Sequence, residues 1–204
     1  MSSVTLAWQP ALFPAAAVEI TRIALDPDCW VDHGVGWLPH ADEVFALLVE
    51  GLPWSGRDRV MYGQRVAEPR LTARWPGGED ATRLPAVLER ARAALSDRYG
   101  VEFDSVGFNL YRDGADSVAW HRDRIPPEIE RPVVALVSLG TPRPFRLRPH
   151  GGGPSRAFRL GNGDLLVTGG LTQRRWEHAV PKTRGAAPRI SVAFRHSGGP
   201  GPER

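Results

Sequence analysis

Three side chains in the C-terminal half of the sequence have the types and spacing of metal ligands. His121 and Asp123 stand two positions apart in Trp-His-Arg-Asp, and His178 lies in Trp-Glu-His. Residues two apart on a strand point to the same face, so His121 and Asp123 can direct an imidazole and a carboxylate at one point, while His178 comes from a distant strand. Two histidines and a carboxylate on one face of an octahedron are typical of non-haem Fe(II) oxygenases. On the triad alone, an ordinary hydrogen-bonded core histidine at position 178 is the alternative.

A predicted strand near the C-terminus alternates apolar and polar residues. One face carries Ile190, Val192 and Phe194, and the other carries Arg189, Ser191, Ala193 and Arg195. Arginines buried on one face need carboxylate partners. The partner is either a protein carboxylate in a structural ion pair or the carboxylate of a bound cosubstrate, which a guanidinium fork recognises well. Asn109 and Tyr111 share this alternation on their own strand, so a polar set could converge inside one barrel.

Four ordered motifs carry a resemblance to a known family. They are Phe-Asn-Leu-Tyr-Arg-Asp-Gly (108–114), Asp-Ser-Val-Ala-Trp-His-Arg-Asp (116–123), Trp-Glu-His-Ala-Val-Pro-Lys (176–182) and Pro-Arg-Ile-Ser-Val-Ala-Phe-Arg (188–195). Together with Pro-Arg-Leu-Thr-Ala (69–73), they resemble the AlkB family of Fe(II)- and 2-oxoglutarate-dependent dioxygenases. The similarity covers about residues 60–196 and is closest to members that repair alkylated nucleic acid.

The resemblance implies a role for each motif residue. His121, Asp123 and His178 would bind Fe(II). Arg189 and Tyr111 would hold the distal carboxylate of 2-oxoglutarate, Asn109 would lie near its metal-chelating end, and Arg195 would close the catalytic site beside the triad. Ser191 stands where the family commonly has Asn, and its hydroxyl can still hydrogen-bond a carboxylate. The implied chemistry consumes O2 and 2-oxoglutarate and hydroxylates an N-linked alkyl carbon, giving succinate, CO2, an aldehyde and the restored base.

The sequence gives fewer indications of how a substrate is recognised. The position two after the metal aspartate, usually acidic in the DNA-repair members, is Ile125, and Glu128 or Glu130 is a possible substitute. A base must leave the stack to reach a buried iron, and extruded bases stack on aromatic rings. Trp75 is the first candidate for this stacking, although a packing role fits it equally, and Tyr62 is the second.

Several arginines flank the predicted site. Each is either a phosphate contact or an ordinary solvated surface charge: Arg70, Arg74, Arg122, Arg124, Arg174 and Arg175. The loop from Pro76 to Arg83 is short and leaves little material for a large lid. This favours single-stranded or unpaired substrates.

The elements that must position these residues are mostly short strands. The predicted strands are 102–111, 117–122, 132–139, 144–148, 156–160, 164–169, 175–180 and 188–196, and a hairpin spans 54–76. Helical spacing of apolar residues predicts one helix over His40–Leu52, with Val44, Leu47 and Leu48 on its apolar face. A second helix is predicted from Leu84 to Tyr99, with Thr82 as cap, Pro85 in the first turn and Gly100 as stop.

This pattern predicts a mainly β (α+β) fold, a double-stranded β-helix or jelly roll with helices covering one sheet. We expect a single domain over 1–204. Within it we expect an N-terminal extension and helix (1–53), a substrate-recognition hairpin or lid (54–83), a helix plus jelly-roll catalytic core (84–196) and a disordered tail (197–204).

Composition sets the outer limits on function. The chain has 204 residues and a single cysteine, Cys29, so thiolate metal cages and internal disulfides are excluded. Its longest apolar runs are far shorter than a membrane span of about 20 residues, and no leader pattern is evident, so we expect a cytoplasmic protein without membrane partners. Lys182 is the only lysine. The arginine excess reflects either coding bias or phosphate binding, with a net charge of only +3.

The sequence therefore predicts a monomeric dioxygenase that dealkylates bases in DNA, with single strands preferred, or in RNA. Two alternatives stay open. One is the same iron chemistry on RNA, protein or a small molecule, and the other is a catalytically silent, cupin-like binding module.

Overall fold

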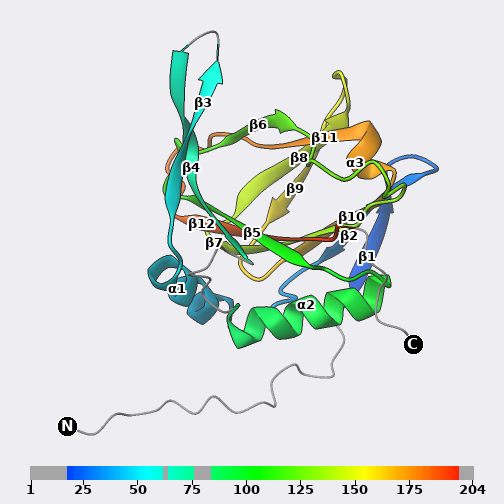
Figure 1. The fold of residues 1–204 in the computed structure, drawn as a ribbon, viewed down its shortest axis with the longest axis horizontal. Helices are drawn as coiled ribbons and strands as arrows, with labels where there is room; N and C mark the ends of the chain where they lie inside the picture. Colours follow the sequence, from blue (N-terminus) through cyan, green and yellow to red (C-terminus); the bar gives the residue numbers. More distant parts are fainter. Residues whose placement is uncertain (1–17, 62–63, 76–83, 198–204) are drawn as a thin grey trace, which may run out of the picture.

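Two antiparallel sheets face each other in the computed structural model, which describes residues 18–61, 64–75 and 84–197 (Figure 1). The larger sheet has the strand order β1-β2-β10-β7-β12-β5-β4-β3, and the smaller has the order β6-β11-β8-β9. The strands of the larger sheet are β1 (Ile20–Ala24), β2 (Cys29–Gly34), β3 (Ser55–Met61), β4 (Gln64–Trp75), β5 (Ser105–Tyr111), β7 (Val134–Gly140), β10 (Leu165–Gly170) and β12 (Arg189–Arg195). Those of the smaller sheet are β6 (Val118–His121), β8 (Arg143–Pro149), β9 (Arg156–Leu160) and β11 (Trp176–Val180).

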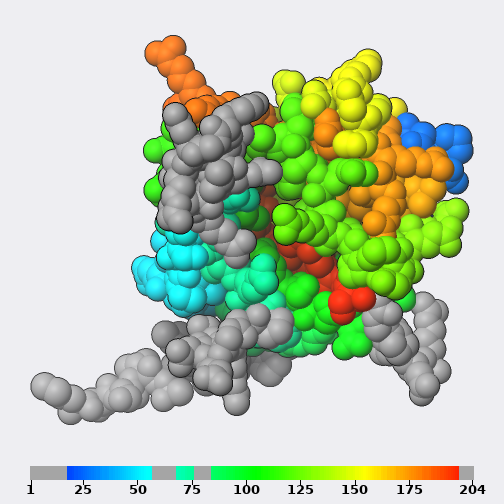
Figure 2. All heavy atoms as spheres, turned by 45° about the horizontal axis from the view of Figure 1, so that its top comes forward, coloured from blue at the N-terminus to red at the C-terminus, as the bar shows by residue number. Residues whose placement is uncertain are grey.

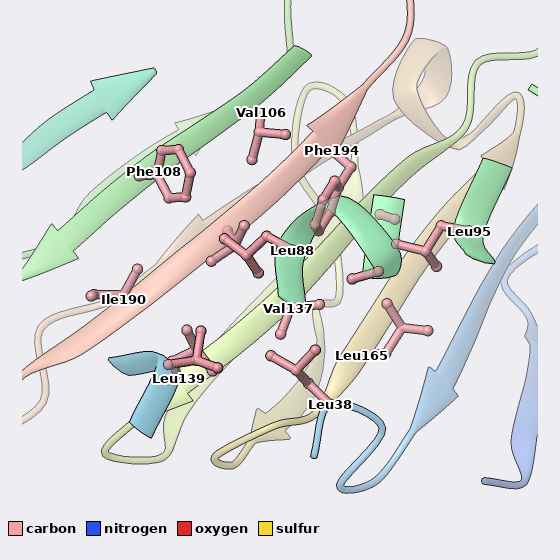
Figure 3. Close-up of a cluster of buried hydrophobic side chains, with 14 of the residues drawn as sticks. Leu38, Leu88, Leu95, Val106, Phe108, Val137, Leu139, Leu165, Ile190 and Phe194 are labelled. Atoms are coloured by element: carbon pink, nitrogen blue, oxygen red, sulfur yellow. The ribbon is translucent and has the colours of Figure 1, made fainter. Parts of the chain in front are cut away.

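The outer face of the larger sheet packs on two helices, α1 (Ala41–Gly51) and α2 (Ala86–Tyr99) (Figure 1). Figure 3 shows the interface, where Ile190 and Phe194 of β12 lie among side chains that include Leu88 and Leu95 of α2. All four are fully buried. Strand alternation therefore sends the other face of β12, with its arginines, toward the smaller sheet, as the sequence predicts.

A second apolar cluster fills part of the space between the two sheets. It joins Tyr111 and Leu166 of the larger sheet to Phe145, Leu147 and Leu160 of the smaller one. The cluster closes one part of the barrel. The remaining inner space is lined by polar side chains and forms the cavity described below.

Both predicted helices are present, with two corrections. On α1, Val44 and Leu48 are buried, whereas Leu47 is 52% exposed and does not belong to the packed face. On α2, Pro85 is the N-cap residue rather than part of the first turn, and its carbonyl accepts the backbone N–H of Leu88 at 2.8 Å. Gly100 ends α2 with φ 64°, as expected for a left-handed C-terminal residue. Thr82 lies outside the described residues.

All eight predicted strands and the hairpin are present, with bounds shifted by a few residues. The strand predicted from 102 begins at Ser105, and the one predicted from 175 begins at Trp176, because a short helix, α3 (Thr172–Arg175), precedes it. The mainly β prediction with helices covering one sheet is thus confirmed.

Two strands were not predicted. β1 and β2 form the edge of the larger sheet, where β2 pairs with β10. Asp32 interrupts the apolar pattern of β2, which is why the strand was not predicted. In the structure Asp32 is buried and makes a bidentate contact with Arg22 at 2.7 and 2.8 Å. Ser197, expected to begin a disordered tail, donates its backbone N–H to Asp104, and 198–204 lie outside the described residues. No helix in the described ranges is long and apolar enough to span a membrane.

Candidate metal centre and cosubstrate pocket

The three predicted metal ligands converge on one point. Their ligand atoms all lie within 4.8 Å of one another, and Asp123 Oδ1 is 3.9 Å from Nε2 of both His121 and His178. Cross-strand pairing explains this, since His121 at the end of β6 is the direct partner of His178 on β11. The Nδ1 atom of His121 lies 2.9 Å from the carbonyl of Ala119. A proton on that Nδ1 leaves the lone pair of Nε2 free for a metal, as in other histidine metal sites.

Burial and charge hold Asp123 and His178 in their metal-binding protonation states. Burial by itself raises the pKa of Asp123, but attraction to Arg195 and to the two histidines outweighs it and keeps this pKa well below its ordinary value. Arg195 Nε donates to Asp123 Oδ2 at 2.9 Å. Burial lowers the pKa of His178 to about 4, despite the opposing pull of Asp123. At neutral pH the carboxylate is therefore ionised and the imidazole neutral, as metal ligation requires.

A buried guanidinium with unmet hydrogen-bonding capacity lies in the same barrel. Arg189 is fully buried, and its Nε donates to Ser138 Oγ at 3.0 Å. Its two terminal nitrogens have no hydrogen-bond partner among the described residues. The guanidinium carbon is 5.4 Å from the ring centre of Tyr111, the cross-strand partner of Arg189. A buried, unpaired fork of this kind fits a carboxylate ligand, so the residues fit 2-oxoglutarate.

The other predicted cosubstrate residues lie along the same two strands. Ser191 pairs directly with Asn109 across β12 and β5. Both line a cavity of about 620 Å³ that also contains Tyr111, the triad and Arg195. Arg70 donates from Nε to Asn109 Oδ1 at 3.0 Å and pairs with Glu68 at 3.0 Å. The cavity thus brings together the predicted metal ligands with Asn109, Tyr111, Ser191 and Arg195, and Arg189 lies against its Tyr111 wall.

A second buried arginine was not predicted. Arg143 is fully buried and donates to the carbonyls of Asp113, Asp116 and Pro181 at 2.8–3.0 Å. Its guanidinium carbon is 5.6 Å from the ring centre of Tyr111. The sequence held a signal for this position, because Arg143 shares its strand parity with the buried Phe145. Arg143 ties the loops after β5 and β11 together beside the cosubstrate pocket.

The predicted phosphate contacts fall into two groups. Arg74, Arg122 and Arg124 are exposed and line the cavity, and Arg70 lines it while bonded to Glu68 and Asn109. Arg174 is instead occupied by the backbone, because it donates to the carbonyls of Pro126 and Ile129 at 2.6 and 2.8 Å.

Arg175 likewise pairs with Asp28 at 2.9 Å. The predicted substitutes for an acid at position 125, Glu128 and Glu130, are exposed, and neither is among the residues that line the cavity. The only acidic side chains on the described cavity wall are Glu68 and Asp123, both paired with arginine.

The predicted base-stacking residue Trp75 packs on the outer side of its strand. With Leu71 and Ala73 it lies against the helix-covered core, and Arg92 of α2 sits 5.7 Å from its ring centre. The alternate residues Arg70 and Arg74 face the cavity. Trp75 still borders a shallower groove next to the cavity, together with Arg74 and Arg124. Tyr62 lies outside the described residues.

Figure 2 shows the hollow from outside. Red atoms of the C-terminal strand are visible between the teal atoms of the hairpin on one side and green atoms on the other. The cavity and the groove share Asp123, Arg124 and Arg195. Together they form an opening with several arginines at its edge and the triad inside.

A double-stranded β-helix with two histidines and a carboxylate beside a buried, unpaired arginine defines the class of non-haem Fe(II) oxygenases with a carboxylate cosubstrate. The chain matches the family model of the 2OG-Fe(II) oxygenase superfamily over residues 56–195, and it belongs to that superfamily.

Relatives of known name lie within the AlkB group, which confirms the predicted resemblance. The chain is 33% identical over 196 residues to alpha-ketoglutarate-dependent dioxygenase alkB homolog 3 of Bos taurus, covering 86% of this chain and 66% of the relative. It is 35% identical over 118 residues to DNA oxidative demethylase ALKBH2 of Homo sapiens, covering 53% and 45%. The chain thus spans slightly less than two thirds of the curated relative alkB homolog 3.

Solved structures support the fold. OsALKBH1 superposes with a TM-score of 0.61 at 16% identity, covering 86% of this chain and all of that one. A Pseudomonas putida prolyl-4-hydroxylase superposes with a TM-score of 0.54 at 19% identity, covering 81% and 92%. At these identities the likeness concerns the jelly-roll fold alone.

Proposed function

We propose that the protein is an Fe(II)- and 2-oxoglutarate-dependent dioxygenase that removes alkyl groups from the bases of DNA or RNA. The observation that carries the oxygenase proposal is the triad together with the unpaired, buried fork of Arg189 in one barrel. The nucleic-acid part is supported by the names of the relatives, which include a DNA oxidative demethylase. The arginines at the opening of the cavity suit a polyanionic substrate.

The residues of the chain have distinct tasks in this reaction. When bound, Fe(II) with 2-oxoglutarate and O2 supplies the oxidising power that hydroxylates the N-linked alkyl carbon, which then leaves as an aldehyde. His121, Asp123 and His178 hold the metal. Arg195 orients Asp123 and keeps it ionised through their 2.9 Å hydrogen bond.

The cosubstrate's distal carboxylate would be held by Arg189 and by Tyr111. Around this site, Leu136, Phe145 and Leu166 form apolar parts of the cavity wall. These side chains limit the access of water to the reacting groups.

We further propose that the substrate is a single strand or an unpaired region, bound by a monomer. The triad lies inside the barrel, so a base reaches it only after leaving its stack, which costs least in unpaired nucleic acid. Arg74 and Arg124 border both the cavity and the adjoining groove. A backbone that follows the groove would pass these two guanidinium groups while one base enters the cavity.

The test uses the protein with Fe(II), 2-oxoglutarate and O2 and a panel of methylated DNA and RNA oligonucleotides, single-stranded and duplex. Formaldehyde and succinate released together, fastest from single strands, support the proposal. Succinate without repaired base refutes the nucleic-acid assignment and favours a protein or small-molecule substrate.

Metal and 2-oxoglutarate binding with no turnover on any substrate favours the silent binding module. The double variant His121→Ala with Asp123→Ala is the inactive control. The cytoplasmic location stays a prediction.

A further inference from the structure

One amide in the cavity wall is held in a fixed orientation with its oxygen unused. Gln173 of α3 is 5% exposed and donates from Nε2 to Thr168 Oγ1 at 2.8 Å. Thr168 Oγ1 in turn lies 3.4 Å from the carbonyl oxygen of Val134, to which it donates. The Oε1 atom of Gln173 has no hydrogen-bond partner among the described residues.

The threonine decides which way the amide points. A hydroxyl has one proton, and Thr168 gives it to the carbonyl of Val134, so its oxygen can only accept from Gln173. The NH2 group of Gln173 must therefore face Thr168, and the oxygen faces away from it. Buried acceptors without a partner are unfavourable and rare in native proteins. The unpaired Oε1 of Gln173 therefore lowers the stability of the protein, and a hydrogen-bond donor from a bound ligand would remove this penalty.

The position of Gln173 says which ligand could supply that donor. The residue lines the metal-site cavity and also an adjoining hollow formed by Arg122, Asp123, Arg124, Ile125 and Arg174. Ile125 offers no polar side-chain atom there, and the guanidinium groups can only donate. Gln173 is therefore placed beside the metal ligand Asp123 as an acceptor.

Each of the other carbonyl- or carboxylate-bearing side chains on the described cavity wall has one oxygen bonded to an arginine. Glu68 Oε2 and Asn109 Oδ1 contact Arg70, and Asp123 Oδ2 contacts Arg195. Of the carbonyl-bearing side chains lining the cavity in the described part of the chain, only Gln173 has a buried oxygen without a hydrogen-bond partner. An acceptor of fixed orientation selects ligands that carry an N–H or O–H at that point and disfavours those that carry a carbonyl.

We propose that Gln173 is a specificity-determining residue whose Oε1 accepts a hydrogen bond from the exocyclic amino group beside the alkylated ring nitrogen. This inference rests on the function proposed above. In 3-methylcytosine one neighbour of the methylated nitrogen carries an amino group, whereas in 3-methylthymine both neighbours carry carbonyl oxygens. The site thus accepts alkylated cytosine and adenine and repels alkylated thymine, because the amide cannot turn its NH2 group toward the base while Thr168 holds it.

The test compares two oligonucleotides that differ only in the lesion, 3-methylcytosine or 3-methylthymine. We expect Gln173→Leu to lower kcat/KM for 3-methylcytosine about tenfold, and to leave kcat/KM for 3-methylthymine unchanged or higher, because the oxygen that repels its carbonyls is gone. Thr168→Val releases the amide, and we expect it to raise kcat/KM for 3-methylthymine. Asn162→Leu is the matched amide control, since Asn162 bonds Gly140 and Asp42 outside the cavity. It should leave the ratio between the two lesions unchanged.

A second readout does not require turnover. Binding of the same oligonucleotides is measured by fluorescence anisotropy with Mn(II) and without 2-oxoglutarate. If the wild type dealkylates neither lesion, the proposed function fails, yet tighter binding of 3-methylcytosine that Gln173→Leu abolishes still supports the role of Gln173. Equal losses for both lesions in folded Gln173→Leu, or an unchanged ratio in both assays, would overturn it.

Discussion

Replacing Arg189 by methionine should make the protein more stable and unable to bind 2-oxoglutarate. The wild-type guanidinium is fully buried, and two of its three nitrogens have no partner in the described structure. Burial lowers the pKa of Arg189, with the nearby Arg143 adding to the effect and Tyr111 opposing it, so the charge is held at a cost. Exchanging a buried ionic group for an apolar one of similar size stabilises by about 1–4 kcal/mol. Losing the bond to Ser138 costs about 1 kcal/mol, which leaves a net gain of about 2 kcal/mol.

Bound 2-oxoglutarate should reverse the order of stability of the wild type and Arg189→Met. A gain of about 2 kcal/mol raises Tm by about 6 °C in a chain of this size. A cosubstrate at a hundred times its Kd stabilises the wild type by about 2.7 kcal/mol and should leave Arg189→Met unchanged. Differential scanning fluorimetry with Mn(II), with and without 2-oxoglutarate, measures both effects. The variant should melt above the wild type without the cosubstrate and below it when the cosubstrate is saturating.

Arg143→Met is the matched control, because this buried arginine has three carbonyl partners. Leaving these carbonyls unpaired should destabilise the protein by about 3 kcal/mol. The reasoning is refuted if Arg189→Met destabilises the protein as much as Arg143→Met does, or if 2-oxoglutarate still raises the Tm of Arg189→Met.

Three further predictions concern other parts of the molecule. Burial and the neighbouring Asp26 raise the pKa of the Cys29 thiol to about 11. A thiol reagent at pH 8 should therefore modify Cys29 only after the protein unfolds, and fast modification of the folded protein would contradict this. The stability that the neutral thiol contributes to the folded state is lost as the pH rises from about 9 to 11. Arg174→Met removes the hydrogen bonds to the 125–129 loop, so hydrogen exchange should quicken there, and unchanged exchange would count against an anchoring role. Arg74→Gln should reduce the salt dependence of single-strand affinity by about 0.7 in log–log slope, whereas Arg175→Gln should leave it unchanged; equal slopes for both variants would exclude the groove as the backbone path.

The sequence predicts the site well where strand alternation alone decides it. The period of two places Arg189, Ser191 and Arg195 on the inner face of β12, and the structure shows them there. The same alternation applied to β4 separates Arg70 and Arg74 from Trp75, which packs on the helix side. The stacking hypothesis for Trp75 rested on residue type and left this parity out; Trp75 still borders the adjoining groove, so its stacking role stays a prediction. Alternation gave the correct faces on β5 and β12, whereas Asp123 lies beyond the end of β6 and reaches the site from outside the strand that was predicted to pair it with His121.

Contacts between distant segments could not be predicted from local patterns. Arg174 looks like a surface charge in the sequence, yet it bonds carbonyls 45 and 48 residues earlier in the chain. The orientation of Gln173 likewise depends on Thr168 and on Val134, which come from separate strands. β2 was missed because Asp32, a residue type rare in buried strands, is neutralised there by Arg22, which lies on the neighbouring β1. In each case the tertiary partner, not the segment itself, determines the structure.

The most direct test of the central claim is an anaerobic Fe(II) titration of the wild type and two histidine variants, followed by calorimetry. His178→Ala removes a proposed ligand, and His150→Ala removes a histidine that pairs with Glu177 at 3.6 Å, outside the triad. We predict one Fe(II) per chain for the wild type and for His150→Ala, and a large loss of affinity for His178→Ala. Fe(II) binding that is equally tight in His178→Ala, in a protein that remains folded, would contradict the metal centre on which the account depends.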